Sequence, residues 1–230
     1  MSLYNEILYR PILNLLVFLY SIIPGQDIGV AIIILTLITR IIFLPLSLKT
    51  LRSQRAMNAL APKLNELKEK HKNDRVALNA ATMALYKENK VNPFAGCLPL
   101  LIQLPILIAL YQALVAGLRP DSLNLLYSFI PQPESLNTLF LGRVSIVDRN
   151  ILLVLLAALA QFFQAKQSMA LMQKDGSLNK EMAAFNRQML YFMPIFIIII
   201  GWKLQAGLML YWITTTLFSM FEQSYIRRRP

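Results

Sequence analysis

The sequence predicts an all-α polytopic membrane protein, and three observations indicate this fold class. The chain has 230 residues, of which 56% are hydrophobic and only 15% are charged, and its mean hydropathy is +0.50. Five segments are long and apolar enough to cross a bilayer, and most cations lie on one side of them. Soluble domains seldom combine these features. We expect a five-transmembrane-helix core with a cytoplasmic helical hairpin and an N-terminal interfacial amphipathic helix.

The five apolar segments each approach the roughly 20 residues that a helix needs to cross ~30 Å of hydrocarbon. They lie at about 28–48, 94–118, 150–169, 189–202 and 206–223. The fourth segment is the shortest, and its helix is expected to reach back toward Phe185. These spans and their connections form a predicted core domain at 25–226, which is followed by a short basic tail at 227–230.

The segment Tyr4–Ile23 is apolar but is interrupted by Arg10, Pro11 and Asn14. Arg10, Asn14 and Ser21 fall near one face of a helix. This arrangement favours a helix that lies in the membrane interface over a sixth span. Residues 1–24 are therefore predicted to form an interfacial helix.

The distribution of cations predicts the orientation of the chain. Lys49–Lys90 contains ten lysines and arginines against four acids, and the connection at 166–187 and the tail raise the number of cations on that side to seventeen. The opposite side carries five cations and five acids. Under the positive-inside rule, the Lys49–Lys90 segment and the C-terminus are cytoplasmic, and the N-terminus is outside.

The cytoplasmic segment at 49–92 is expected to form two helices. Apolar residues recur there at helical spacing, at Met57, Leu60, Leu64 and Leu67. The sequence HKND then predicts a turn, with Asp74 as the N-cap of the second helix. Pro62 is expected to kink the first helix or to mark its start. Two helices joined by a short polar turn predict an antiparallel hairpin, and a solvated loop with incidental helicity is the alternative.

One arginine, Arg40, lies inside the first span. A snorkelling anchor that reaches the headgroups would explain an isolated arginine. The same span and other spans also carry polar residues, which should face protein or water because a polar group facing lipid is costly. The clearest of these are Thr36, Gln103, Gln161, Gln164 and Thr215. No span offers Arg40 a clear acidic partner, since Glu222 lies near the cytoplasmic end of the last span, so we expect a hydrated cavity and not a buried ion pair.

The polar residues of the spans do not match the usual catalytic or metal sites. Every aspartate lies in a loop, the single histidine, His71, lies in the cytoplasmic segment, and Cys97 is the only cysteine. The sequence contains no HExxH pair and no glycine-rich phosphate loop. We therefore expect no enzyme activity, no metal site and no cofactor. The remaining classes are a chaperone, a channel or a transporter.

Four stretches of the sequence resemble the YidC/Oxa/Alb family of membrane protein insertases. Residues 92–111, NPFAGCLPLLIQLPILIALY, are similar to the second core span of that family, and LTLITRIIFLPL is similar to its first core span with a single arginine. LAPKLNELKEKHKND resembles the cytoplasmic hairpin, and GLMLYWITTTLFSMFEQ resembles the last span. The four stretches occur in the family's order and are distributed over nearly the whole length of residues 25–226, as in a short form that consists of the core domain.

The resemblance implies five core helices around a hydrophilic groove that is open to the cytoplasm and to lipid and is sealed toward the outside. It implies that the protein inserts and folds nascent membrane proteins in the bacterial cytoplasmic (inner) membrane, alone or with the Sec translocon. The basic hairpin is then expected to contact the ribosome or a targeting receptor.

The resemblance also implies roles for individual residues. By motif position, Arg40 corresponds to the family's groove arginine and Thr36 to the polar residue one turn before it. Tyr211 and Trp212 fall at an aromatic pair of the last span that faces the groove. Gln164 lies near a family glutamine, although the sequence FFQAKQS permits a shift of one residue. The predicted groove residues are Arg40, Thr36, Gln103, Gln161, Gln164, Tyr211, Trp212 and Thr215.

Two other functions fit a polar intramembrane cavity. A small anion or solute transporter would use Arg40 as its binding site, although the five spans contain no inverted repeat of the kind that many transporters have. A scaffolding protein is the third possibility, and the polar residues on three separate spans argue against it.

Overall fold

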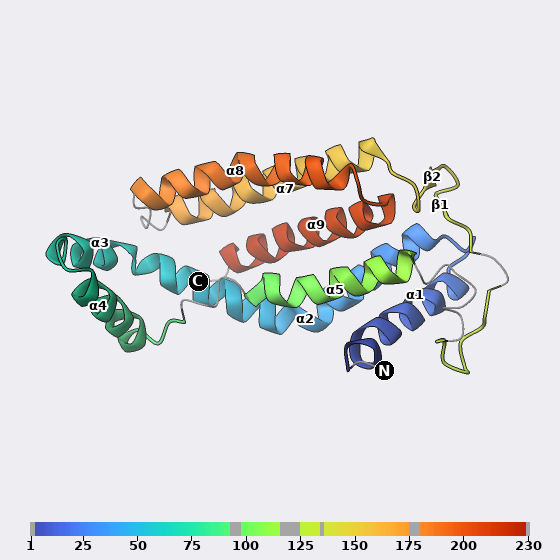
Figure 1. The fold of residues 1–230 in the computed structure, drawn as a ribbon, viewed down its shortest axis with the longest axis horizontal. Helices are drawn as coiled ribbons and strands as arrows, with labels where there is room; N and C mark the ends of the chain where they lie inside the picture. Colours follow the sequence, from blue (N-terminus) through green and yellow to red (C-terminus); the bar gives the residue numbers. More distant parts are fainter. Residues whose placement is uncertain (1–2, 93–97, 116–124, 134–135, 175–179, 229–230) are drawn as a thin grey trace.

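The computed structural model describes residues 3–92, 98–115, 125–133, 136–174 and 180–228, and the side chains of these residues except 98–102, 171–174, 180–186 and 227–228. The described segments are mainly helical, which confirms the predicted all-α class (Figure 1). The elements in chain order are η1 (Asn5–Tyr9), α1 (Arg10–Ile22), α2 (Ile28–Ala59), α3 (Ala61–Lys70), α4 (Arg75–Glu88), α5 (Leu98–Val115), β1 (Leu139–Phe140), β2 (Val144–Ser145), α7 (Ile151–Lys174), α8 (Lys180–Gly201) and α9 (Ala206–Arg228).

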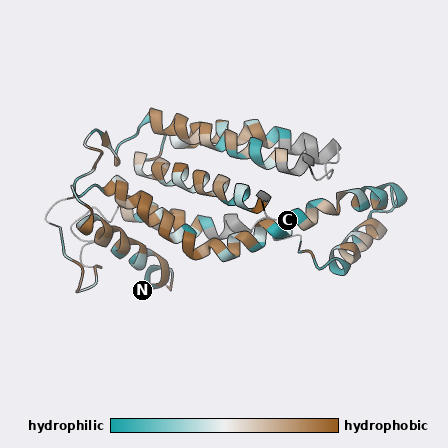
Figure 2. Cartoon of the chain, turned by 180° about the vertical axis from the view of Figure 1, so that it is seen from behind, coloured by the Kyte–Doolittle hydropathy of each residue, from teal (hydrophilic) through white to brown (hydrophobic). Residues whose placement is uncertain are grey.

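The long helices lie side by side in an elongated bundle (Figure 1). Helix α9 packs against α7 and α2, α8 packs against α7, and α1 packs against α2 and α5. Helices α3 and α4 pack together beyond the end of α2, while β1 and β2 lie at the opposite end of the bundle. Hydrophobic residues dominate the bundle and hydrophilic residues gather on α3 and α4 (Figure 2).

Two of the described helices are long and apolar enough to cross a membrane, namely Ile28–Ala59 and Ile151–Ala170. The described apolar parts of α5 and α8, Gln103–Val115 and Arg187–Gly201, are shorter. The predicted ends of the second span, at Phe94 and Leu118, lie outside the described residues. Helix α8 begins at Lys180, so it reaches back past Phe185 as expected.

Helix α2 is longer than the predicted first span at 28–48. It begins at Ile28, as expected, but continues past Leu48 to Ala59. The stretch 49–59 was expected in the hairpin and is instead part of the same helix as the first span. This stretch is rich in Leu, Arg, Gln, Ala and Met, which favour helix, and it contains no glycine or proline, so nothing ends the helix where the apolar segment ends.

The helices at 61–88 begin at the residues that the sequence indicates. Pro62 lies in the first turn of α3, where its missing N–H has no intrahelical acceptor in any case. The carboxylate of Asp74 accepts hydrogen bonds from the backbone N–H groups of Val76 and Ala77 at 3.0 and 2.9 Å. The predicted N-cap of the second helix is therefore confirmed.

Asp27 connects the start of α2 to the β1–β2 hairpin. Its carboxylate accepts hydrogen bonds from the backbone N–H groups of Val30 at 3.0 Å and Leu141 at 2.6 Å. Leu141 and Gly142 have φ values of 51° and 68°, and two left-handed central residues are typical of the tight turns that join antiparallel strands. One side chain thus caps a helix and holds a turn that lies more than a hundred residues away in the sequence.

The polar face of α1 contacts protein. Asn14 is 2% exposed. Its amide donates hydrogen bonds to the carbonyls of Arg10 and Leu125 at 2.7 and 3.1 Å, and its oxygen accepts one from the N–H of Tyr127 at 2.6 Å. The Nε of Arg10 donates to the carbonyl of Leu125 at 3.1 Å. This face therefore binds the segment at 125–127 rather than the membrane surface, and the interfacial position of α1 stays a prediction.

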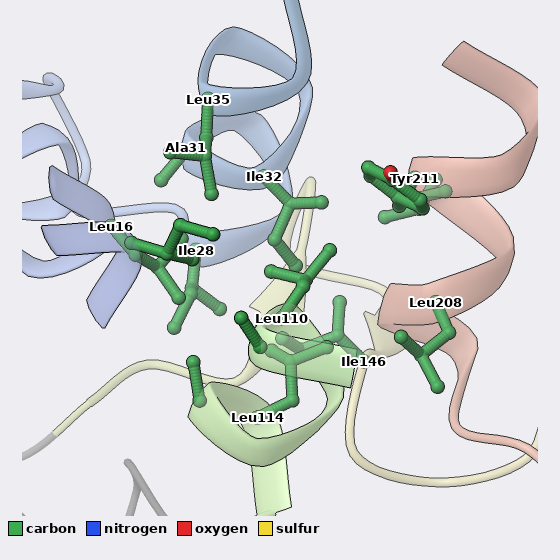
Figure 3. Close-up of a cluster of buried hydrophobic side chains, with 14 of the residues drawn as sticks. Leu16, Ile28, Ala31, Ile32, Leu35, Leu110, Leu114, Ile146, Leu208 and Tyr211 are labelled. Carbon is green, nitrogen blue, oxygen red and sulfur yellow. The ribbon is translucent and has the colours of Figure 1, made fainter. Parts of the chain in front are cut away.

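A cluster of buried apolar side chains joins α1, α2, α5 and α9 at the end of the bundle near the β hairpin (Figure 3). Its members include Leu16, Ile28, Ala31, Ile32, Leu35, Leu110, Leu114, Ile146, Leu208 and Tyr211. The N–H groups of Ala206 and Gly207 donate to the carbonyls of Asp148 and Ile146, both at 2.8 Å. Apolar side chains therefore fill the end of the bundle at which α2 and α9 begin.

Candidate functional site

Arg40 lies on α2 and is bound to α9. Its side chain is 17% exposed. The Nη2 atom donates hydrogen bonds to the backbone carbonyl of Thr215 at 2.9 Å and to the hydroxyl of Ser219 at 2.5 Å. The two acceptors are four residues apart and so lie on the same face of α9. The guanidinium thus contacts the neighbouring helix and does not extend to lipid headgroups as an isolated snorkelling anchor would.

Glu222 is an acidic partner of Arg40, so the expectation of a cation without a counter-ion is wrong. The carboxylate Oε2 lies 3.9 Å from Nη1 of Arg40, and Glu222 is only 2% exposed. Helix α9 continues to Arg228, so Glu222 lies within the helix rather than at its end. An extended arginine side chain is about as long as one helical turn, roughly 5 Å. Arg40 can therefore reach Glu222, which the sequence places closer to the cytoplasm.

A cavity of about 410 Å³ lies beside this pair. Four helices contribute to its wall, and most of the lining residues are polar. They are Arg40, Ser47, Leu51 and Gln54 of α2, Gln103, Leu104 and Leu107 of α5, Gln161, Gln164 and Ser168 of α7, and Tyr211, Trp212, Thr215, Thr216, Ser219, Glu222 and Gln223 of α9. Seven of the eight predicted groove residues therefore line one cavity.

Hydrogen bonds connect the predicted polar residues around the cavity. The amide of Gln103 donates to the hydroxyl of Tyr211, which joins α5 to α9. On the α7 side, the indole Nε1 of Trp212 donates to Oε1 of Gln161 at 3.4 Å, and Nε2 of Gln161 donates to Oε1 of Gln164 at 2.8 Å. These bonds satisfy part of the hydrogen-bonding capacity of the amides and leave the rest available to a bound group.

Thr36 is the predicted groove residue that does not line the cavity. It is 1% exposed, and its hydroxyl donates to the carbonyl of Ile32 at 2.6 Å. A threonine inside a helix commonly satisfies its hydroxyl in this way. Thr36 lies one turn before Arg40, next to Leu35 of the apolar cluster, so it marks the apolar boundary of the site.

Several residues of the cavity wall were not among the predicted groove residues. They are Ser47, Gln54, Ser168, Thr216, Ser219, Glu222 and Gln223. A signal was present in the last span, because Thr215, Ser219 and Glu222 follow one another at spacings of four and three residues, which places them on one helical face. Taken singly, the residues that were not predicted gave no signal, because serine, glutamine and a near-terminal glutamate are common at the ends of spans.

The acidic residues in the described part of the chain do not form a metal site. No group of three His, Cys, Asp or Glu side chains lies close enough together there to hold a metal ion. The chemistry available at the cavity is thus that of a guanidinium paired with one carboxylate, surrounded by neutral amides and hydroxyls.

Comparisons with known proteins show that the sequence of this chain is similar to one family. The family model described as the 60 kDa inner membrane protein matches residues 18–230. The membrane protein insertase YidC of Fusobacterium nucleatum is 36% identical over 201 residues, which are 87% of this chain and 86% of the relative.

Longer relatives are also similar to this chain. The membrane protein insertase YidC of Geotalea daltonii is 34% identical over 221 residues, which are 96% of this chain and 37% of the relative. The membrane protein insertase YidC 2 of Listeria innocua is 36% identical over 207 residues, which are 88% of this chain and 65% of the relative. This chain thus spans most of the first relative but only about a third to two thirds of the other two.

Proposed function

The chain belongs to the YidC/Oxa/Alb family of membrane protein insertases, and we propose on this premise that it inserts nascent membrane proteins into the bilayer through the cavity beside Arg40. It is a helical protein of the bacterial inner membrane. Its substrates are hydrophobic segments of newly made membrane proteins together with the polar residues that flank them.

In this proposal, α2, α5, α7, α8 and α9 are the five transmembrane helices. Support comes from the ends of the helices, because α2, α7 and α9 end and α8 begins at the same end of the bundle, where α3 and α4 lie (Figure 1). The Lys49–Lys90 segment at that end carries ten cations, which makes this end cytoplasmic and the N-terminus external under the positive-inside rule. The apolar cluster then closes the cavity toward the outside.

The energetics of insertion define what the cavity has to do. A leucine, isoleucine, phenylalanine or valine at the centre of a span contributes about −0.3 to −0.6 kcal/mol to insertion, whereas a charged residue there costs about 2.5 to 3.5 kcal/mol. The hydrophobic segment therefore enters lipid spontaneously, and the polar flank that must cross is the barrier. A polar cavity that extends partway through the bilayer shortens the apolar distance that this flank has to cross.

The observation that carries the proposal is the position of a single cation, paired with one carboxylate, among neutral polar side chains from four helices. Arg40 can attract a carboxylate in the flank through charge-assisted hydrogen bonds. The amides of Gln103, Gln161 and Gln164 can exchange partners with the passing backbone. Trp212 presents a half-buried aromatic surface beside them, which suits the hydrophobic part of the substrate as it leaves toward lipid.

The positive charge of the proposed cytoplasmic end favours anionic partners. The ten cations of Lys49–Lys90 favour contacts with anionic lipid and with ribosomal RNA. We propose that α3 and α4 receive the substrate from the ribosome or a targeting receptor, and that the protein acts alone or beside the Sec translocon.

The test is insertion into liposomes that contain the purified chain. The substrate is a single-spanning protein with an acidic N-terminal tail, and protease protection of the tail measures insertion. Arg40→Ala is expected to reduce insertion at least tenfold, and Arg40→Lys is expected to retain part of it because the charge is kept. Arg143→Ala, which removes an exposed cation of the β hairpin, is the matched control and is expected to insert normally.

Two further measurements make the result specific. Because Arg40→Ala alone leaves Glu222 buried without its partner, which is strongly destabilising, the double variant Arg40→Ala/Glu222→Gln tests loss of the cation in a chain without that penalty. Passage of small anions is measured in the same liposomes. Anion flux without insertion would indicate the transporter and contradict the proposal.

A further inference from the structure

The pairing of Arg40 with Glu222 leaves hydrogen-bonding capacity unused on both side chains. The distance of 3.9 Å between Nη1 and Oε2 exceeds the 2.7–3.2 Å of a hydrogen bond, so the two charges attract each other without sharing one. Among the described residues, Nε of Arg40 and Oε1 of Glu222 are buried and have no hydrogen-bond partner. The ion pair therefore neutralises charge but does not use all the donors of the guanidinium.

Glu222 lines the same cavity as Arg40. A carboxylate that enters the cavity must therefore approach the guanidinium while Glu222 stands beside it. Two carboxylates then lie beside one guanidinium, and their mutual repulsion weakens the binding of the substrate carboxylate. Inside a protein, repulsion between neighbouring carboxylates raises the dissociation constant by on the order of tenfold or more.

An arginine without such a neighbour would hold an acidic substrate strongly. Charge-assisted hydrogen bonds from a guanidinium to a carboxylate are short and about twice as strong as neutral ones. Differences in affinity between related complexes appear mainly as differences in the rate of dissociation. An insertase must release its substrate, so tight binding at Arg40 would slow the reaction that the cavity serves.

We propose that Glu222 is an internal counter-ion of Arg40 that competes with acidic groups of the substrate and so makes their capture brief. The inference rests on the proposed insertase function and adds a specificity-determining residue to it. A neutral flank passes without this competition, whereas an acidic flank is held at Arg40 only against the repulsion of Glu222. When the flank leaves, Glu222 remains as the partner of Arg40, which avoids an unpaired buried cation.

The neighbouring residue Gln223 permits a test in the opposite direction. It lines the same cavity, and its Oε1 is buried without a hydrogen-bond partner among the described residues. Gln223→Glu adds a carboxylate of nearly the same shape, and Glu222→Gln removes one. Glu69→Gln causes the same change in net charge on the exposed surface of α3, where the Glu69 side chain is 79% exposed, and serves as the control.

The experiment measures how long a substrate stays in the cavity. Liposomes containing the purified chain receive a single-spanning substrate with a photoreactive residue in its N-terminal tail, which carries either two aspartates or two asparagines. Illumination at successive times gives the lifetime of the crosslinkable complex, and protease protection gives insertion. Glu222→Gln is expected to lengthen the lifetime of the aspartate complex about tenfold and to leave the asparagine complex unchanged.

The variants separate competition from a purely structural role. Gln223→Glu is expected to shorten the lifetime of the aspartate complex severalfold, and Glu69→Gln is expected to change neither complex. Equal effects of Glu222→Gln on both substrates would overturn the inference, because they would report a change in helix packing. If Glu222→Gln does not fold, Gln223→Glu decides alone: an unchanged aspartate complex overturns the inference. Failure of the wild-type chain to insert either substrate would instead refute the proposed function.

Discussion

The side-chain amide of Gln103 on α5 donates a hydrogen bond to the hydroxyl of Tyr211 on α9, although the two residues are 108 positions apart in the sequence. Tyr211 is 4% exposed and belongs to the apolar cluster, while Gln103 lines the cavity. The bond therefore lies where the apolar end of the bundle meets the polar cavity. It holds α5 against α9 at a level where few other polar contacts join the two helices in the described part of the chain.

Removal of this bond should lower the stability of the bundle. Tyr211→Phe deletes the hydroxyl and leaves the amide of Gln103 without that partner, which is expected to cost about 1 kcal/mol and to lower Tm by roughly 2–4 °C. Thermal unfolding in detergent micelles provides the measurement. In a cycle with Gln103→Leu, the double variant should be less destabilised than the sum of the single variants, by about 1 kcal/mol. Tyr111→Phe, at an exposed tyrosine of the same helix as Gln103, should change Tm little.

Asn14 should be required for attachment of the segment at 125–127 to α1. Its side chain makes three hydrogen bonds, two as a donor and one as an acceptor for the N–H of Tyr127. Asn14→Leu leaves that N–H and the carbonyl of Leu125 with fewer partners, which is expected to destabilise the protein by about 1–3 kcal/mol. Limited proteolysis should show faster cleavage near 125–133. Asn14→Asp keeps the acceptor for Tyr127 and should be cleaved more slowly than Asn14→Leu; equal cleavage of the two variants would contradict this account.

Gly29 should be intolerant of any side chain because Phe140 lies against it. A Cβ atom at Gly29 would lie 2.7 Å from Cγ and 2.8 Å from Cβ of Phe140, closer than real Cβ contacts permit. Gly29→Ala is therefore expected to push the β hairpin away from α2 and to cost about 1–3 kcal/mol, measured by thermal unfolding. The second change Phe140→Ala should recover part of the loss in the double variant. An unaltered Tm in Gly29→Ala would show that the hairpin moves freely.

The sequence was sufficient for the class of the fold, because composition, the length of apolar segments and the distribution of cations can be read directly from it. Asp74 illustrates this point: an N-cap depends only on the residues that immediately follow it, and its hydrogen bonds to Val76 and Ala77 agree with the prediction. The end of α2 was harder to place. The apolar segment in the sequence ends near Leu48, but the helix continues to Ala59. A helix ends where the sequence provides a terminating residue such as glycine or proline, and not where the apolar residues end.

The cavity was predictable as a set of polar residues but not as a set of contacts. Inward orientation of Arg40, Gln103 and Gln161 follows from the cost of exposing polar groups to lipid. The pair Arg40–Glu222 does not follow, because it depends on the axial offset of α2 relative to α9, which only packing determines. The same limitation applies to Asn14, whose partners at 125–127 come from a connection without a sequence pattern of its own.

Two adjacent residues of α7 provide a test of whether the cavity is hydrated and open to the cytoplasm. Gln164 lines the cavity, whereas the neighbouring Phe163 is 48% exposed on the surface of the bundle, where the proposed topology places lipid. In a Cys97→Ser background, Gln164→Cys should react with a membrane-impermeant maleimide added from the cytoplasmic side at least tenfold faster than Phe163→Cys, because thiol labelling requires the thiolate and therefore water.

The comparison is controlled by position, since the two cysteines lie at nearly the same depth and differ only in the face of the helix that carries them. Reagent added from the outside should label neither residue, because the apolar cluster with Ile32, Leu110 and Leu114 lies between Gln164 and that side. Labelling of Gln164→Cys from the outside alone would reverse the proposed orientation. Equally slow labelling of both cysteines from either side would mean that Arg40 lies in a dry pocket, where an incoming polar flank would gain nothing from the cavity.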